Sequence, residues 1–257
     1  MSDKTKDSVR TQFGRQASRY AASPVHSASD GLTALVRLAA PSPGDHVLDV
    51  ATGAGFTALA LAPHCRRVVG VDFTPGMIRE AATLRHTRGV SNVFFCMGDA
   101  EALPYRDGVF DIVACRRAAH HFPDLPRALG EMTRVARAGG RVLLDDTCAP
   151  EDPAVAALMN TWERRRDPSH VANHPPTRLR EMVERSGLDL EAVTMTRVPL
   201  EFDDWVRLSG TPQAEAEELR LSFLGASPAA RAAFRIHVQG PQVRFSWDEV
   251  VILGVKR

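Results

Sequence analysis

The run VLDVATGAGFTALALA at residues 47–62 joins an apolar strand, a turn containing Gly53 and Gly55, and a helical segment. Glycine at both turn positions lets backbone N–H groups approach a ligand closely, with the amino end of a helix behind them. The G-x-G-x-x-A pattern fits the fingerprint of dinucleotide-binding domains, and it also fits a tight turn that binds nothing. The run therefore predicts a strand–turn–helix unit without selecting its ligand.

Short β-branched runs alternate with helical segments on the carboxyl side of this unit. Strands are predicted at 46–51, 67–72, 92–97, 110–115 and 140–146, and helices at 56–62, 75–87 and 125–137. Near-continuous apolar strands that alternate with helices indicate a parallel sheet covered on both faces. The expected fold class is α/β, a Rossmann-like three-layer αβα sandwich.

Composition narrows the classes of function. Lysine and arginine together number 32 against 31 aspartates and glutamates, so charge gives no reason to expect nucleic acid or a membrane as partner. The amino terminus lacks an apolar signal segment, and the apolar runs fall well short of the roughly 20 residues of a membrane span. Cys65, Cys96, Cys115 and Cys148 are scattered, which favours reduced thiols over a zinc site. The expected location is the cytoplasm.

Acidic residues end consecutive predicted strands. Asp72 closes the second strand 19 residues after Gly53, and Asp99 follows the third strand. At the carboxyl edge of a parallel sheet, the Asp72 carboxylate can accept both hydroxyls of an adenosine ribose. Asp99 and the backbone of Ala100 can frame an adenine edge. Each aspartate alone could be a solvated strand end or a helix cap, but their shared edge favours an adenosine-containing ligand.

Five segments together resemble a known family: VLDVATGAGFTALALA, VVGVDFTPGMI, GDAEALPY, FDIVACRRAAHHF and RVARAGGRVLLDD. In order and spacing they resemble the class I S-adenosylmethionine-dependent methyltransferases. The resemblance is greatest to the branch related to ubiquinone and menaquinone biosynthesis methyltransferases, called methyltransferase type 11. It covers about residues 10–198. It implies a mostly parallel seven-stranded sheet in the order 3-2-1-4-5-7-6, with strand seven antiparallel.

The resemblance also implies S-adenosyl-L-methionine as cofactor. Gly53 and Gly55 would pass under its methionine part, Asp72 would hold its ribose, and Asp99 with Ala100 would bind the amino edge of the adenine. Phe13 and Tyr20 would fold over the cofactor from the amino-terminal helices. The full set of expected cofactor residues is Phe13, Tyr20, Ala51, Gly53, Gly55, Asp72, Phe73, Met77, Gly98, Asp99, Ala100 and Arg116. Asp49, inside the first motif, favours a cofactor with a free ammonium group over the pyrophosphate of NAD.

One domain spanning residues 1–257 is expected. Residues 1–40 form an amino-terminal helical cap, 41–198 the cofactor-binding core, 199–238 a helical lid insertion and 239–257 the final strand. The link between the sixth strand, near 190–198, and the final one is not expected to make a parallel crossover, so VVILGV at 250–255 should pair antiparallel near the sheet edge.

The segment CRRAAHHF at 115–122 bears on the methyl acceptor. It lacks the Asn/Asp-Pro-Pro-aromatic turn of enzymes that methylate adenine or glutamine nitrogens. A catalytic metal would need carboxylates after both the fourth and the fifth strand; Asp145 and Asp146 could serve at the fifth, but the fourth offers only cysteine and arginines. His120 and His121 are the candidate general bases, because an imidazole with a pKa of about 6.5 suits removal of a proton from the acceptor. Either histidine could instead cap a helix or pack against the cofactor. Arg166 and His170 are candidate substrate contacts, with a solvated basic loop as the alternative.

The predicted function is methyl transfer from S-adenosylmethionine to an O, N or C atom of a small-molecule acceptor. Two alternatives stay open at this point. One is a non-methylating protein on the same fold, such as a cyclase or a regulatory binder, and the other is an NAD-linked oxidoreductase. The sequence leaves open the identity of the acceptor and the choice between monomer and homodimer.

Overall fold

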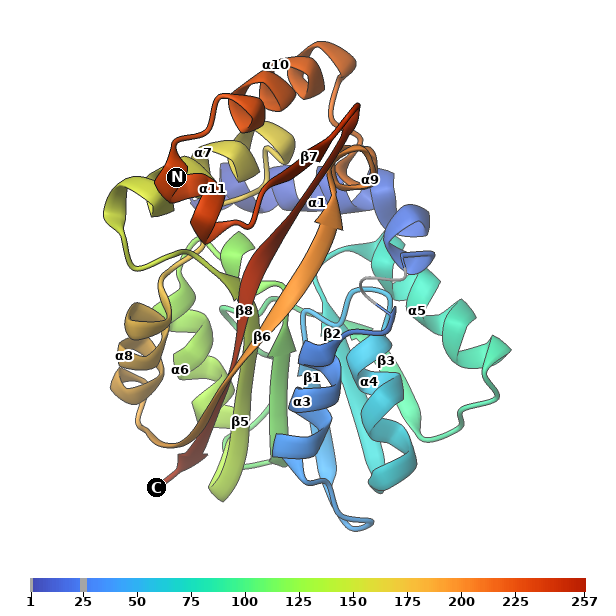
Figure 1. The fold of residues 1–257 in the computed structure, drawn as a ribbon. Helices are drawn as coiled ribbons and strands as arrows, with labels where there is room; N and C mark the ends of the chain where they lie inside the picture. Colours follow the sequence, from blue (N-terminus) through green and yellow to red (C-terminus); the bar gives the residue numbers. More distant parts are fainter. Residues whose placement is uncertain (1, 24–26) are drawn as a thin grey trace.

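An eight-stranded sheet forms the centre of the computed structural model, which describes residues 2–23 and 27–257 (Figure 1). Its order is β3-β2-β1-β4-β5-β8-β6, and the short strand β7 pairs with β8. The strands are β1 (His46–Val50), β2 (Arg67–Asp72), β3 (Val93–Met97), β4 (Phe110–Arg116), β5 (Ala136–Cys148), β6 (Leu188–Glu201), β7 (His237–Gln239) and β8 (Gln242–Lys256). Strands β3, β2, β1, β4 and β5 are parallel, and β8 runs antiparallel to β5 and β6.

This order confirms the predicted topology, with β8 in the place of the seventh strand. Strand β7 is an addition that the sequence pattern did not predict. It forms a hairpin with β8 in which Gln239 faces Gln242 across a turn of Gly240 and Pro241. Gly240 has a φ of 60°, a conformation that glycine adopts without steric cost.

The helices are α1 (Ser2–Ala21), α3 (Asp30–Ala39), α4 (Phe56–Leu61), α5 (Pro75–Thr87), α6 (Leu125–Val135), α7 (Pro153–Arg166), α8 (Pro176–Arg185), α9 (Phe202–Ser209), α10 (Gln213–Leu224) and α11 (Pro228–Ala233). Several begin at side-chain caps: Ser29 accepts from Leu32 N, Asp124 from Arg127 N, and Asp152 from Ala154 N. Such caps satisfy backbone N–H groups that have no partner within the first turn, and each contributes about 1 kcal/mol.

Each face of the sheet is covered by its own apolar cluster. Leu35 of α3 and Leu61 of α4 pack against one face, on strand residues such as Ile112. Leu129 and Met132 of α6, together with residues of α8, cover the other face. Burying one such side chain is worth about 1.5–3 kcal/mol, so the two clusters fix the three-layer sandwich that the alternating pattern predicts.

A third apolar cluster lies above the carboxyl ends of the parallel strands. It joins α7, α9, α10 and α11 to the upper ends of β6 and β8 (Figure 1). Trp162 and Phe223 stack with ring centroids 4.0 Å apart and are fully buried, and Phe202 meets Phe223 edge-on at 5.2 Å. The elements above the sheet are therefore packed around a core of their own.

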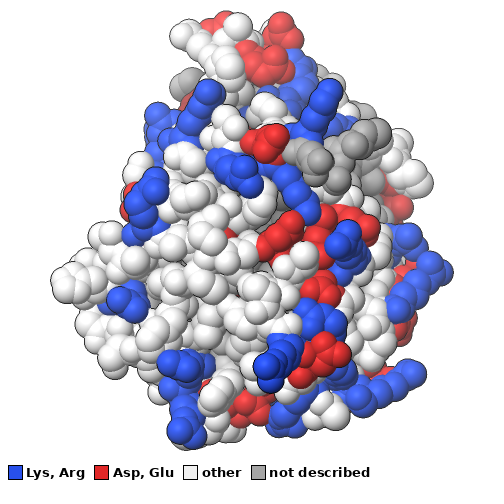
Figure 2. Space-filling view, turned by 180° about the vertical axis from the view of Figure 1, so that it is seen from behind, with Lys and Arg blue, Asp and Glu red and all other residues white. Residues whose placement is uncertain are grey.

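The charged side chains form no uniform field on the face seen in Figure 2. Basic and acidic residues are interspersed there around a broad uncharged area, in keeping with a formal net charge of +1. Within residues 2–23 and 27–257, no helix is both long and apolar enough to cross a membrane.

Candidate active site

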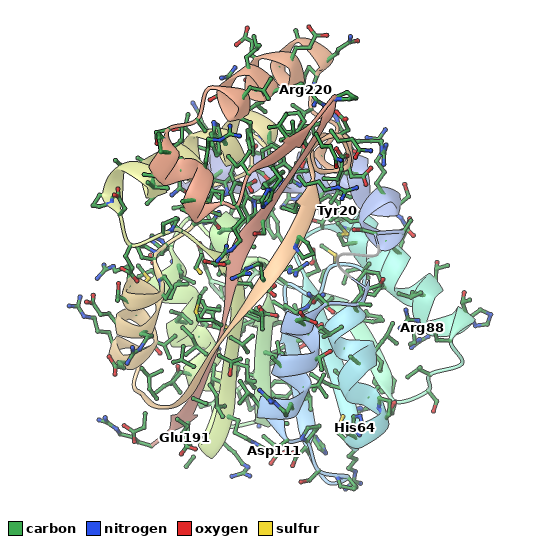
Figure 3. The ribbon with its side chains drawn as sticks, in the orientation of Figure 1. Tyr20, His64, Arg88, Asp111, Glu191 and Arg220 are labelled. Atoms are coloured by element: carbon green, nitrogen blue, oxygen red, sulfur yellow. The ribbon has the colours of Figure 1, made fainter. Side chains whose placement is uncertain are left out.

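A cavity of about 840 Å³ lies between the carboxyl ends of the parallel strands and the elements above them. Binding sites for small molecules span roughly 300–1,000 Å³, so this one lies towards the upper end of that range. Tyr20 of α1, which lines the cavity, lies between Arg220 at the top of the molecule and His64 and Asp111 at the opposite end of the sheet (Figure 3). Open parallel sheets bind ligands at this carboxyl edge.

Most of the residues expected at the site from sequence line this cavity. The expected cofactor residues do so with the exception of Gly55, and His120, His121 and Arg166 also line it. Gly55 and His170 lie behind its wall. The sequence therefore located the cavity, while the geometry separates residues that face it from residues that support it.

The glycine turn after β1 holds three residues at positive φ: Ala51 at 53°, Gly53 at 54° and Gly55 at 85°. A Cβ on Gly53 would meet no atom within 4 Å, so its backbone borders open space. A Cβ on Gly55 would come within 2.7 Å of the Phe95 ring. Gly55 is thus required by packing at the start of α4, and it does not itself line the cavity.

Asp49 does not face the cavity. It is buried beneath the turn, where one carboxylate oxygen accepts from Thr52 Oγ1 at 2.5 Å and from Ala58 N at 3.0 Å. Burial raises its pKa to about 7. Asp49 therefore holds the turn against α4. Because it does not line the cavity, it does not place the expected negative charge beside the ammonium group of a cofactor.

Asp72 ends β2 at the cavity wall. Its two oxygens accept from Gly53 N and Thr74 N, each at 2.8 Å, which fixes the carboxylate against the glycine turn. Burial raises its pKa from the ordinary value, against the effect of these hydrogen bonds. Asp72 also lines the cavity, so its carboxylate can accept a hydrogen bond from a ligand hydroxyl.

Asp99, after β3, is joined to helix α1 by Lys6. Lys6 Nζ lies 2.7 Å from Asp99 Oδ2 and 2.6 Å from Glu101 Oε2. The guanidinium group of Arg10, one turn further along α1, lies 4.3 Å from the centroid of the Phe73 ring. Helix α1 therefore covers the part of the cavity where adenine was expected. The sequence did not predict the role of Lys6, because an isolated lysine near an amino terminus belongs to no recognisable motif.

Arg116, at the end of β4, is buried and donates from Nε to Thr57 Oγ1 at 3.1 Å. Burial lowers its pKa, and the neighbouring Arg117 lowers it further. Arg117 has a φ of 50°, which is costly for a residue with a Cβ, and its Nε contacts Glu249 Oε1 at 2.5 Å. The two arginines bring positive charge to the end of the cavity next to the glycine turn.

His120 forms a dyad with Asp146. Its Nδ1–H donates to Asp146 Oδ1 at 2.6 Å, and its backbone N–H donates to Asp146 Oδ2 at 2.9 Å. Burial alone would lower the pKa of His120, but the adjacent carboxylate outweighs it and raises that pKa above its ordinary value. The sequence considered Asp146 only as a metal ligand. Its pairing with His120 follows from the adjacent positions of β4 and β5 in the sheet.

His121 is held differently from His120. Its Nδ1 lies 3.1 Å from the carbonyl oxygen of Ser169, which can only accept, so Nδ1 carries the proton and donates it. The hydroxyl of Ser169 donates instead to Asp167 Oδ1 at 2.6 Å. Burial and the neighbouring His120 lower the pKa of His121 to about 4. His121 is therefore neutral at physiological pH, with the lone pair on Nε2.

His170 lies behind the histidine pair. Its ring centroid is 5.6 Å from that of His120, and its Nε2 pairs with Asn160 Oδ1 at 2.8 Å. Its pKa is lowered, first by burial and then by the other two histidines. His170 does not line the cavity and packs behind the pair, and its contact with a substrate stays a prediction. Among the described residues, no group of His, Cys, Asp or Glu side chains has the geometry to hold a metal ion.

Comparisons with known proteins identify the family of this chain. A family profile for a methyltransferase domain matches residues 41–187, from before β1 to the end of α8. The chain belongs to this methyltransferase family. The methyltransferase is 35% identical to the uncharacterized methyltransferase YcgJ of Bacillus subtilis over 249 residues, which is 96% of this chain and 98% of that protein.

The crystal structure of YcgJ superposes on the methyltransferase with a TM-score of 0.84 and 36% identity, covering 88% of this chain and 98% of that one. A demethylmenaquinone methyltransferase of Thermus thermophilus is 36% identical over 132 residues, 51% of this chain and 60% of that protein. The [4+2]-cyclase SpnF, at 18% identity, a TM-score of 0.64 and coverage of 88% and 80%, shares the fold alone. These findings confirm the predicted family and its reaction, S-adenosylmethionine-dependent methyl transfer.

Proposed function

We propose that this methyltransferase binds S-adenosyl-L-methionine along the carboxyl edge of β1, β2 and β3 and methylates a small molecule that carries a removable proton. The chemistry of the lining residues supports the cofactor. Asp72 places a carboxylate on the cavity wall, where ribose hydroxyls can donate to it, and the space beside Gly53 admits a ligand against the backbone. No described atom accepts from the backbone N–H of Ala100, which suits a ring nitrogen of adenine. Arg116, which lines the cavity at the end of β4, is the candidate for the carboxylate of the methionine part.

When bound, the cofactor supplies an electrophilic methyl group on a sulfonium centre. The protein then has to align the acceptor atom and, where that atom carries a proton, remove it. His120 is the better base of the pair because Asp146 orients its ring and stabilises its protonated form. His121, with its low pKa, is suited to accept a hydrogen bond from the acceptor through Nε2 and so to orient it.

The observation that carries this proposal is the position of the Asp146–His120 dyad on the same cavity as Asp72 and the glycine turn. The test is calorimetric titration with S-adenosylmethionine, S-adenosylhomocysteine and NAD, followed by mass-spectrometric detection of S-adenosylhomocysteine released with a panel of phenols, amines and carbon acids. Micromolar binding of the two sulfur compounds and turnover with a protic acceptor are expected. Binding of NAD alone would overturn the proposal.

A further inference from the structure

The end of the cavity furthest from the glycine turn is built differently from the cofactor end. Trp205 of α9 and Trp247 of β8 line it, together with the aliphatic side chains of Val198, Leu200 and Leu208. Asp204 and Arg207 of α9 also line it, but they are exposed to solvent and pair with each other. Flat aromatic surfaces and aliphatic walls favour a planar, apolar ligand. The end beside the glycine turn is suited to the polar groups of the cofactor. The end beside the two tryptophans is therefore left for the acceptor.

One cation, Arg166, is fixed in this apolar wall. Its Nε donates to the carbonyl of Trp205 at 3.0 Å, and its Nη1 donates to Glu163 Oε2 at 3.0 Å. The guanidinium also lies 5.2 Å from the centroid of the Trp205 ring. No described residue accepts a hydrogen bond from Nη2, and this atom is not sealed inside the protein, unlike Trp205 Nε1. Two N–H donors of a rigidly held guanidinium therefore remain for a ligand in the cavity.

The charge of Arg166 is already balanced. Glu163 is buried, with one oxygen on Arg166 and the other accepting from Trp247 Nε1 at 2.7 Å. Asp167 is also close enough to act on Arg166, and the phenol of Tyr20 faces it from α1. A ligand carboxylate would enter a poorly solvated site that already holds two carboxylates. An uncharged oxygen can accept from Nη2 without this repulsion.

We propose that the acceptor is a planar, apolar and uncharged molecule that places its reacting hydroxyl at His120 and a carbonyl or ether oxygen at Arg166 Nη2. This inference rests on the proposed function, because it assumes that the other end of the cavity holds the cofactor. It narrows the acceptor to aromatic molecules with two oxygen functions, one for each of these two residues on the cavity wall.

The experiment compares three probes by calorimetry in the presence of saturating S-adenosylhomocysteine: 2-naphthol, 6-acetyl-2-naphthol and 6-hydroxy-2-naphthoate. The acetyl compound should bind about tenfold or more tightly than either of the others, the factor expected for one hydrogen bond to a charged group. In Arg166→Met this advantage over 2-naphthol should disappear. Arg165→Met is the matched control, because Arg165 is the preceding residue of α7 and pairs with Glu215 and Glu218 of α10.

Loss of Arg166 leaves Glu163 unpaired and could unfold the protein. Arg166→Lys keeps the charge but lacks the Nη2 donors, so it should lose the same selectivity while keeping the melting temperature. Equal affinity for all three probes, preference for the carboxylate, or retained selectivity in the lysine variant would each overturn the inference. In any of these cases, intact binding of S-adenosylhomocysteine leaves the proposed function standing, whereas its absence removes both.

Discussion

Asp72 is the residue on which the proposed cofactor site depends most directly. Replacing it by asparagine keeps its size and one acceptor oxygen, so Gly53 N retains a possible partner, but it removes the charge that ribose hydroxyls would meet. S-adenosylhomocysteine should bind more weakly by about 1.5–3 kcal/mol for each charge-assisted hydrogen bond lost. Calorimetry on Asp72→Asn measures this directly. Asp107→Asn, an exposed carboxylate in the loop before β4, is the control, and equal affinity in both variants would remove Asp72 from the site.

His120 should govern the pH dependence of turnover. The base must be neutral to act, and Asp146 raises its pKa, so the rate should rise with pH and level off above the ordinary histidine pKa of about 6.5. Asp146→Asn removes the main cause of the raised pKa of His120, and burial then lowers that pKa. The rise of the rate with pH should therefore move to lower pH, and the maximum rate should fall because the base is weaker.

The matching loss-of-base experiment replaces His120 by glutamine, which should lower kcat by about 10²–10⁴-fold with little effect on cofactor affinity. His64→Gln makes the same change at the opposite end of the sheet (Figure 3) and should leave kcat unchanged. A pH profile that Asp146→Asn does not move would show that the dyad is structural.

At the residue level, the sequence could place Asp72, Asp99 and the histidine pair because each follows a recognisable strand. It could not tell His120 from His121, since their difference arises from Asp146 on β5 and from Ser169 in the loop after α7. Those partners are distant in the chain, and their pairing depends on tertiary packing that no local pattern encodes.

Among the elements, helix α1 is held over the cavity largely by polar and small-residue contacts. Lys6 binds Asp99 and Glu101, Gln12 donates to the Ser209 carbonyl, and Gly14 and Ala17 pack closely on Gly76. Removing the Lys6 ion pairs by Lys6→Met should therefore favour opening of the helix. The rates of S-adenosylhomocysteine association and dissociation should both rise, by about fivefold for a pair worth near 1 kcal/mol.

Stopped-flow tryptophan fluorescence measures both rates, and Lys4→Met on the same helix is the control because Lys4 is exposed. Added salt should accelerate exchange in the wild type and have little effect in Lys6→Met, because the ion pairs that salt screens are absent there. Identical rates in the two variants would mean that α1 is not fastened by Lys6.

The predictable elements are those with a strong period. Strands β1 to β4 and helices α4 to α6 follow from alternating apolar runs and lie close to the expected positions, whereas β5 begins at Ala136, inside the helix expected at 125–137, rather than at residue 140. Strand β7 was missed because three residues, His237–Gln239, are too few to show a period and all three are exposed.

For the whole molecule, the cavity lies where the sheet edge, α1 and the upper cluster meet, so a ligand there contacts parts that are remote in the chain. S-adenosylhomocysteine should bind the folded state only and stabilise it by about 2.7 kcal/mol at one hundred times its Kd. At about 2–4 °C per kcal/mol for a protein of this size, the melting temperature should rise by about 5–10 °C. NAD at the same concentration should cause no rise, and Asp72→Asn should need a higher ligand concentration for the same shift. An equal rise with NAD would show that the turn around Gly53 selects a dinucleotide, and the roles given to Asp72 and Asp99 would then have to be reassigned.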